Sequence, residues 1–134
     1  MKKLLLILLL LTFNTSAQQS WVHFQVMFDY YAPTESSFFM VSNDNGDTAI
    51  FVQPSTPYEY LDTILPLDTG YYTVTLTDNF GDGWTSQQPS WFKMGNTCQG
   101  LILDLQLQGL SFSRLDTVVH VLPCPPPGPP AQPI

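Results

Sequence analysis

Apolar and polar residues alternate along most of the chain beyond residue 20, which is the period of a β-strand with one buried face. The pattern is clearest over residues 69–77, where Tyr72, Val74 and Leu76 share one face and Tyr71 shares the other with three threonines. Residues 21–30 alternate in the same way, so we expect a second half-buried strand there. The inward positions of this second strand are Val22, Phe24, Val26, Phe28 and Tyr30.

Shorter segments with the same alternation complete the pattern. They predict further strands over residues 36–42, 48–53, 59–65, 91–94, 101–107 and 117–122. The strand over residues 59–65 is expected to stop before Pro66, and Leu101, Leu103, Leu105 and Leu107 are expected to face inward. No segment has the convincing period of an amphipathic helix. About seven to nine short strands separated by turns predict an all-β fold, an antiparallel two-sheet sandwich of jelly-roll type.

Residues 43–47, Asn-Asp-Asn-Gly-Asp, separate two of these strands. Asn-Gly favours a tight hairpin turn because both residues tolerate positive φ. The carboxylates of this segment could also hold a metal ion, but the hairpin turn explains the segment better.

The first seventeen residues have the layout of a secretory signal peptide. Lys2 and Lys3 precede an apolar run over residues 4–13, and small or polar residues 14–17 follow it. The run is too short for a membrane span of about 20 residues. We therefore expect a mature domain over residues 18–124, secreted or held at the cell surface and not inserted in a membrane.

Residues 125–134 are rich in proline and predict a semi-rigid linker. A linker normally leads to another module, so we expect this chain to be part of a larger exported protein. The alternative is a natural tail.

The chain has a net charge of −7, with eleven acidic residues against four lysines and arginines. Beyond the signal peptide, Lys93 and Arg114 are the remaining basic side chains. Such a surface repels the phosphates of nucleic acids and anionic membranes, which argues against both as partners. It attracts divalent cations, although acidity alone also keeps an exported protein soluble.

Two cysteines, Cys98 and Cys124, are predicted to form a disulfide, because cysteines of exported proteins usually pair. A zinc site would instead need His23 or His120 to meet the pair. Each histidine lies in a strand-like segment, where a surface position is more common than a catalytic one. A serine triad needs a histidine base held by an acid, so we expect no enzymatic activity.

The main candidate for chemistry is the segment Asp-Asn-Phe-Gly-Asp-Gly-Trp over residues 78–84, which directly follows the clearest strand. Its glycines allow a tight curl that can point several oxygens inward. Calcium takes six to eight oxygen ligands at about 2.3–2.6 Å, so Asp78 and Asp82 are candidate ligands. The alternative is a turn in which both aspartates only cap backbone amides. An EF-hand is a poorer fit, because Phe80 and Pro89 would occupy two of its ligand positions.

Residues 70–84 resemble a signature of secreted bacterial β-sandwich modules in which a strand ends in Asp-x-Tyr/Phe-Gly-Asp-Gly-Trp. Residues 28–36, residues 96–100 and residues 122–125 are similar to the flanking segments of these modules. The modules are similar in layout to CUB domains, which hold calcium near one end of the sandwich. The usual four cysteines of CUB domains are not present here.

The resemblance implies a CUB-like, non-catalytic, monomeric module of an exported protein, serving interaction or adhesion. It implies calcium bound by Asp78 and Asp82, with Glu35 arriving from another strand and Asp29 as a weaker fourth ligand. The ligand of such a module would be a surface protein or an extracellular glycan.

The alternative function is carbohydrate binding, with Trp84 and Trp91 forming a stacking platform near residues 78–84, joined by Tyr71 or Tyr72. Aromatic rings stack on the apolar faces of sugars, but they serve equally well in a core. In that case Trp84 plugs its loop and Trp91 faces the core.

Overall fold

The computed structural model of the chain describes residues 18–85 and 88–127. The predicted signal peptide, residues 1–17, and residues 128–134 of the proline-rich segment lie outside the described residues. Among the described residues, no helix has the length and apolar character needed to cross a membrane.

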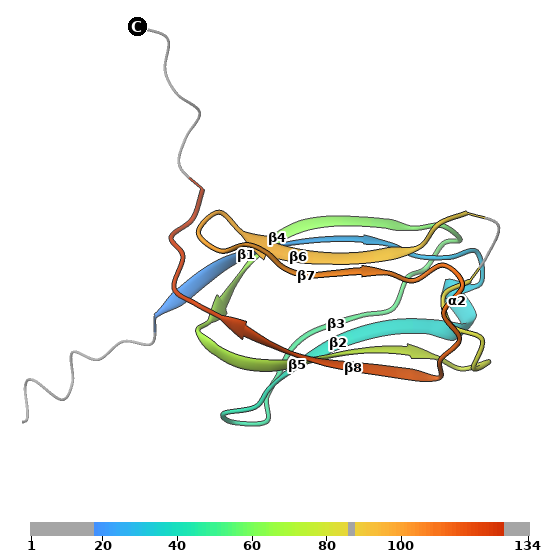
Figure 1. The fold of residues 1–134 in the computed structure, drawn as a ribbon, viewed down its shortest axis with the longest axis horizontal. Coiled ribbons are helices and arrows are strands. Elements are labelled where there is room, and N and C mark those ends of the chain that lie inside the picture. Colours follow the sequence, from blue (N-terminus) through green and yellow to red (C-terminus); the bar gives the residue numbers. More distant parts are fainter. Residues whose placement is uncertain (1–17, 86–87, 128–134) are drawn as a thin grey trace, which may run out of the picture.

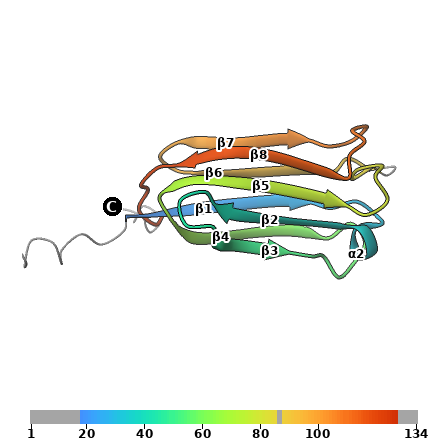
Figure 2. The ribbon, with the colours of Figure 1, turned by 90° about the horizontal axis from the view of Figure 1, so that it is seen from below.

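The described chain forms two antiparallel four-stranded sheets packed face to face, which confirms the predicted sandwich (Figures 1 and 2). Sheet A has the strand order β4-β1-β6-β7, and sheet B has the order β3-β2-β5-β8. Sheet A contains β1 (Gln19–Met27), β4 (Tyr60–Asp68), β6 (Trp91–Asn96) and β7 (Gly100–Gln106). Sheet B contains β2 (Ser36–Ser42), β3 (Thr48–Val52), β5 (Gly70–Asp78) and β8 (Arg114–Val121). One helical turn, α2 (Ala32–Glu35), lies between β1 and β2.

The core lies between the sheets and is built from the inward faces that the alternation predicted. Phe38 of β2 and Phe92 of β6 come from opposite sheets, and their ring centroids lie 5.0 Å apart in an edge-to-face contact. Phe24 of β1 packs against both rings. The fully or nearly fully buried apolar side chains of the core include Val22, Val26, Phe28, Met40, Tyr72, Val74, Leu76, Met94 and Leu107.

Three details differ from the alternation. β4 does not stop before Pro66 but continues to Asp68, because it is an edge strand and a proline without an N–H is tolerated there. Leu101 is 61% exposed instead of buried, since the pairing of β6 with β7 shifts register next to Gly95. β1 ends at Met27, so Tyr30 lies in the following turn and is half exposed.

The hairpin turn over residues 43–47 is confirmed. It joins β2 to β3, Gly46 takes a positive φ of 76°, and the Asp47 amide donates to the Asn45 side chain at 2.9 Å. The Asn45 side chain therefore closes the turn that the sequence predicted.

The predicted disulfide is also confirmed. Cys98 and Cys124 are bonded, with their Cα atoms 5.8 Å apart, so neither thiolate is available for a zinc site. The Trp21 amide donates to the Cys124 carbonyl at 3.1 Å, and the Cys124 amide donates to the Gln19 carbonyl at 3.2 Å. The disulfide and these bonds hold the segment after β8 against the start of β1. The opposite end of the sandwich carries α2 and the end of β5 (Figure 1).

Candidate metal site

Asp78 is the last residue of β5, and its side chain organises the loop that follows. The carboxylate Oδ2 accepts hydrogen bonds from the Asp82 amide at 3.0 Å and from the Gly83 amide at 3.1 Å. The Asp78 backbone carbonyl accepts from the Gly81 amide at 3.2 Å. The predicted capping role of Asp78 is therefore present in the structure, and it occupies only one carboxylate oxygen.

The glycines of this loop are required by its backbone. Gly81 and Gly83 have φ values of 82° and 81°, a region that L-residues with side chains rarely adopt. A Cβ atom at Gly83 would also lie 2.0 Å from the Leu110 carbonyl oxygen. The loop can pack against the segment after β7 only with glycine at this position.

Trp84 anchors the loop in the core. Its side chain is fully buried, its ring centroid lies 4.8 Å from that of Phe28, and its indole N–H donates to the Thr77 carbonyl at 3.0 Å. A ring with no exposed face cannot stack on a sugar, so the predicted ligand-binding role of Trp84 is wrong. Tyr72 is also buried, so its ring is not available for stacking on a sugar either.

Glu35 approaches the loop from the other side of the site. It ends α2, a single turn with Pro33 in its first turn, where proline is well tolerated. The Asn79 amide donates to the Glu35 carbonyl at 2.9 Å, and Ser36 pairs with Asp78 in the sheet. These contacts hold the end of α2 beside the loop.

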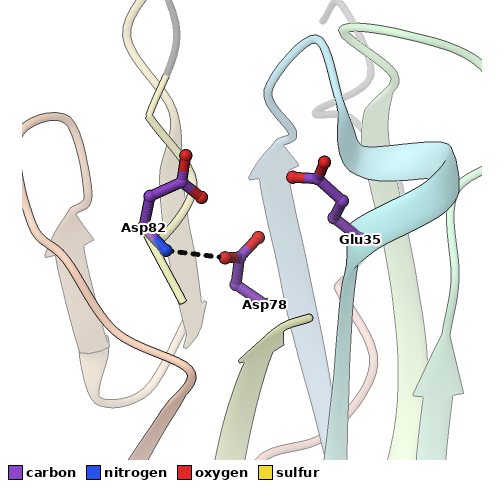
Figure 3. Close-up of side chains that lie close together, drawn as sticks. All are labelled: Glu35, Asp78 and Asp82. Carbon is purple, nitrogen blue, oxygen red and sulfur yellow. Dashed lines mark hydrogen bonds between the residues drawn. The ribbon is translucent and has the colours of Figure 1, made fainter. Parts of the chain in front are cut away.

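The result is an acidic cluster of Glu35, Asp78 and Asp82. One carboxylate oxygen from each residue lies within 4.8 Å of the others, and the three side chains point into a common space between α2 and the loop (Figure 3). The structure thus brings together three of the four predicted ligands, from segments more than forty residues apart in sequence.

Asp29, the fourth predicted ligand, lies beside this cluster without being a member of it. Its Oδ1 accepts a hydrogen bond from the Ser36 hydroxyl at 3.4 Å, and its side chain is almost fully buried. Asp29 Oδ2 and Asp78 Oδ1 are buried without a hydrogen-bond partner. Buried carboxylate oxygens without a partner are costly, so their presence indicates a site that accepts a cation or a proton.

The pKa is raised at three carboxyl groups of the site. Burial raises the pKa of Asp29 to about 6, with a further contribution from the charge of Asp78. Burial and the neighbouring Asp82 raise the pKa of Asp78, and burial and Asp78 raise the pKa of Glu35. Within residues 18–85 and 88–127, the ion pairs join His23 to Asp62 and Arg114 to Asp116, and neither includes the cluster. A bound cation would relieve this repulsion.

Comparison of the chain with models of protein families, with curated proteins and with solved structures gave no match.

An all-oxygen donor set of this kind suits a hard cation. Calcium binds carboxylate and carbonyl oxygens with flexible geometry, whereas zinc favours sulfur and nitrogen. Asp78 Oδ1, Asp82 and Glu35 could hold such an ion, and Asp29 could contribute through its free oxygen. The strand-end position of Asp78 and the Asp-x-x-x-Asp spacing were visible in the sequence.

Trp91, the second predicted stacking residue, lies half buried at the start of β6 and does not face the core. It alternates with the buried Phe92, so its ring lies on the outer face of sheet A. Its ring centroid lies 5.8 Å from that of Tyr60 and 5.1 Å from Lys93 Nζ. The contact between Trp91 and Tyr60 could not be predicted from the alternation, because Tyr60 comes from another strand.

Proposed function

We propose that this chain contains a CUB-like, calcium-stabilised, non-catalytic module of a larger exported protein, serving interaction or adhesion at or outside the cell surface. The observation that carries the calcium part is the convergence of three carboxylates, Glu35, Asp78 and Asp82, together with the buried and unpartnered oxygens Asp78 Oδ1 and, next to the cluster, Asp29 Oδ2. A cation held by the three carboxylates would offset the mutual repulsion of the acids and could be bound by Asp78 Oδ1, with Asp29 next to it.

An exported location is supported by two independent features. The first seventeen residues have the order of charged, apolar and small residues that a signal peptide needs. The bonded pair Cys98 and Cys124 fits an oxidising compartment. Calcium is compatible with that compartment, where weak extracellular sites operate at about 10⁻⁴–10⁻³ M.

A non-catalytic role is supported by the positions of the histidines. His23 is held by an acid, Asp62, on the outer face of sheet A, but among the described residues no serine or threonine hydroxyl is hydrogen-bonded to its ring, and both cysteines form the disulfide, so the nucleophile of a triad is missing. The ring of His120 stacks on Tyr71 at 4.0 Å on sheet B. The residues of the acidic cluster lie at the end of β5, in the loop after it and at the end of α2. An ion bound there would hold these segments together, so we infer a stabilising role for it and not a catalytic one.

The test is thermal unfolding of the full chain with saturating calcium and with chelator. A ligand at one hundred times its dissociation constant adds about 2.7 kcal/mol, which raises the midpoint by roughly 10–20 °C for a domain of this size. Asp82→Ala should lose the increase, because it removes one ligand. Asp47→Ala is the matched control, since Asp47 is an exposed acid in the β2–β3 turn, and it should keep the increase.

Absence of a calcium-dependent increase in the wild-type chain would contradict the proposal. An equal increase in Asp82→Ala would place the binding site elsewhere and contradict it as well.

A further inference from the structure

The outer face of sheet A carries a hollow of about 330 Å³, which is unrelated to the acidic cluster. Its size falls within the range of small-molecule sites, about 300–1,000 Å³. Residues of β1, β6, the β6–β7 turn and β7 line it, and polar side chains stand among apolar and glycine residues. The lining includes His23, Gln25, Lys93, Asn96, Thr97 and Leu101.

Gly95 is the reason that this face is hollowed. It pairs with His23 of β1 on one side and with Leu101 of β7 on the other. A Cβ atom at Gly95 would lie 2.3 Å from the Gly100 carbonyl oxygen, so the close approach of β7 excludes a side chain here. The middle of the face therefore has no side chain of its own, while the neighbouring residues stand around it.

The polar side chains beside the hollow are held by one another. His23 Nε2 and Asp62 Oδ1 lie 2.5 Å apart, and the Tyr60 hydroxyl donates to Asp62 Oδ2 at 3.4 Å. Gln25 Nε2 donates to the Tyr60 hydroxyl at 3.3 Å. The hydrogen bond from His23 also lowers the pKa of Asp62, so this carboxyl stays ionised and accepting. Groups that are already oriented lose less entropy when they bind a ligand.

Aromatic residues occupy the next outward positions along the strands, because Trp21 lies two residues before His23 and Trp91 two residues before Lys93. Trp91 pairs with Met27 at the end of β1, and Tyr60 contacts it edge-on across the face. Trp21 lies six residues before Met27 on the same outward face of β1, which corresponds to roughly 20 Å of strand. Both tryptophans are half buried, so each exposes part of a ring.

We propose that this face binds a neutral oligosaccharide, extended along β1 and β6 between Trp91 and Trp21. Sugars present hydroxyl groups on their edges and apolar C–H groups on their faces, which matches oriented polar side chains bordered by aromatic rings. Lys93 pairs with Asp104 on one side and with Gln25 on the other, and Gln25 in turn pairs with Asp62. This face thus carries two carboxylates beside Lys93, and the chain has a net charge of −7, so an anionic glycan is disfavoured.

The glycan would be the ligand of the binding module proposed above, and in that respect this inference rests on the proposed function. The face is formed by other residues than the acidic cluster. Binding of the glycan is therefore expected both with calcium and with chelator, as long as the domain is folded, and the two proposals can fail separately.

The experiment is a titration of the ¹⁵N-labelled full chain, followed by amide chemical shifts. The probes are cellohexaose, xylohexaose, mannohexaose and laminarihexaose, each at millimolar concentration, with hexagalacturonate as the anionic comparison. We expect at least one neutral probe to shift amides of β1, β6 and β7. Trp91→Ala and Gln25→Ala should each weaken binding about tenfold, since one removes a ring and the other a hydrogen-bonding group. Tyr71→Ala is the control, because Tyr71 is an exposed aromatic residue of sheet B.

Gln25→Ala keeps the experiment interpretable if Trp91→Ala does not fold, because Gln25 is a partly exposed polar residue outside the core. The proposal is overturned if none of the neutral probes shifts any amide, or if the shifts map to residues 78–84 or to sheet B. Binding of hexagalacturonate alone, or equal weakening by Tyr71→Ala and Gln25→Ala, would overturn it too.

Discussion

Asp78 shows how one side chain can satisfy two interpretations of the same motif. Its Oδ2 caps the amides of Asp82 and Gly83, which confirms the turn interpretation for that oxygen. Its Oδ1 is buried and has no hydrogen-bond partner. The interpretation as a metal ligand therefore stays a prediction for the second oxygen, and the two roles do not compete.

Asp29 leads to a prediction about pH. Its pKa rises from an ordinary value of 3.8 to about 6 in the folded chain without calcium, mainly because it is buried. Between about pH 6 and pH 4, Asp29 is therefore mostly protonated in the folded state and mostly ionised in the unfolded state. The contribution of Asp29 to the free energy of unfolding therefore increases as the pH falls from 7 to 4, by about 1–3 kcal/mol.

Asp29→Asn isolates this contribution, because the amide keeps the shape of the side chain and cannot ionise. In chelator at pH 7 the variant should be more stable than the wild type, and the difference should shrink as the pH falls to 4. Urea unfolding at a series of pH values measures it. A difference between the two proteins that does not change with pH would contradict the pKa of about 6.

At the scale of elements, the loop after β5 depends on a backbone that only glycine allows. Gly83 combines a φ of 81° with a carbonyl oxygen 2.0 Å from the position of a Cβ atom. Gly83→Ala should therefore lower the free energy of unfolding by about 2–4 kcal/mol, since strain and a steric clash add. It should also weaken the calcium response, because the Gly83 amide holds Asp78 Oδ2.

Gly109→Ala is the matched control for this prediction. Gly109 has a φ of 83° but no atom within 4 Å of its Cβ position, so only the backbone strain applies. We expect a loss of about 1–2 kcal/mol. Equal losses in chemical denaturation of the two variants would show that the contact with Leu110 does not constrain the loop.

The elements also show where periodicity is a sufficient guide and where it is not. β5 has no irregularity in its pairing, and Tyr72, Val74 and Leu76 face the core as predicted. β7 has a register shift next to its partner residue Gly95, and Leu101 faces solvent. Such a bulge depends on the partner strand, so the sequence of β7 alone does not reveal it.

At the scale of the whole molecule, the disulfide and the acidic cluster lie at opposite ends of the sandwich (Figure 1). The bond between Cys98 and Cys124 spans 26 residues and holds the segment after β8 against β1. Replacing both cysteines with alanine should lower the free energy of unfolding by about 3 kcal/mol, mainly by loosening the unfolded chain.

Urea unfolding of the double variant measures this loss, and thermal unfolding with calcium serves as its internal control. The calcium-dependent increase in midpoint should be unchanged, because the two sites share no residues. Loss of the calcium response in the double variant would show that the two ends of the sandwich are coupled, and unchanged stability would contradict the predicted constraint.

Several properties of this protein follow from local sequence alone. The strands, most of their buried faces and the turn at Gly46 depend on residues that are neighbours in the chain, so alternation and an Asn-Gly pair were enough to predict them. The pairing of Cys98 with Cys124 followed from their number and from the expectation of an exported chain.

The arrangement of the sites depends on contacts between distant segments. Strand order places β1 between β4 and β6 and brings Tyr60 to Trp91, and the approach of β7 to Gly95 of β6 completes the hollow. The burial of Trp84 and the approach of Glu35 to Asp78 likewise depend on how the sheets pack. A periodic pattern records which face of a strand is buried, but it does not record which strand lies beside it, because that choice is made by pairing across the whole domain.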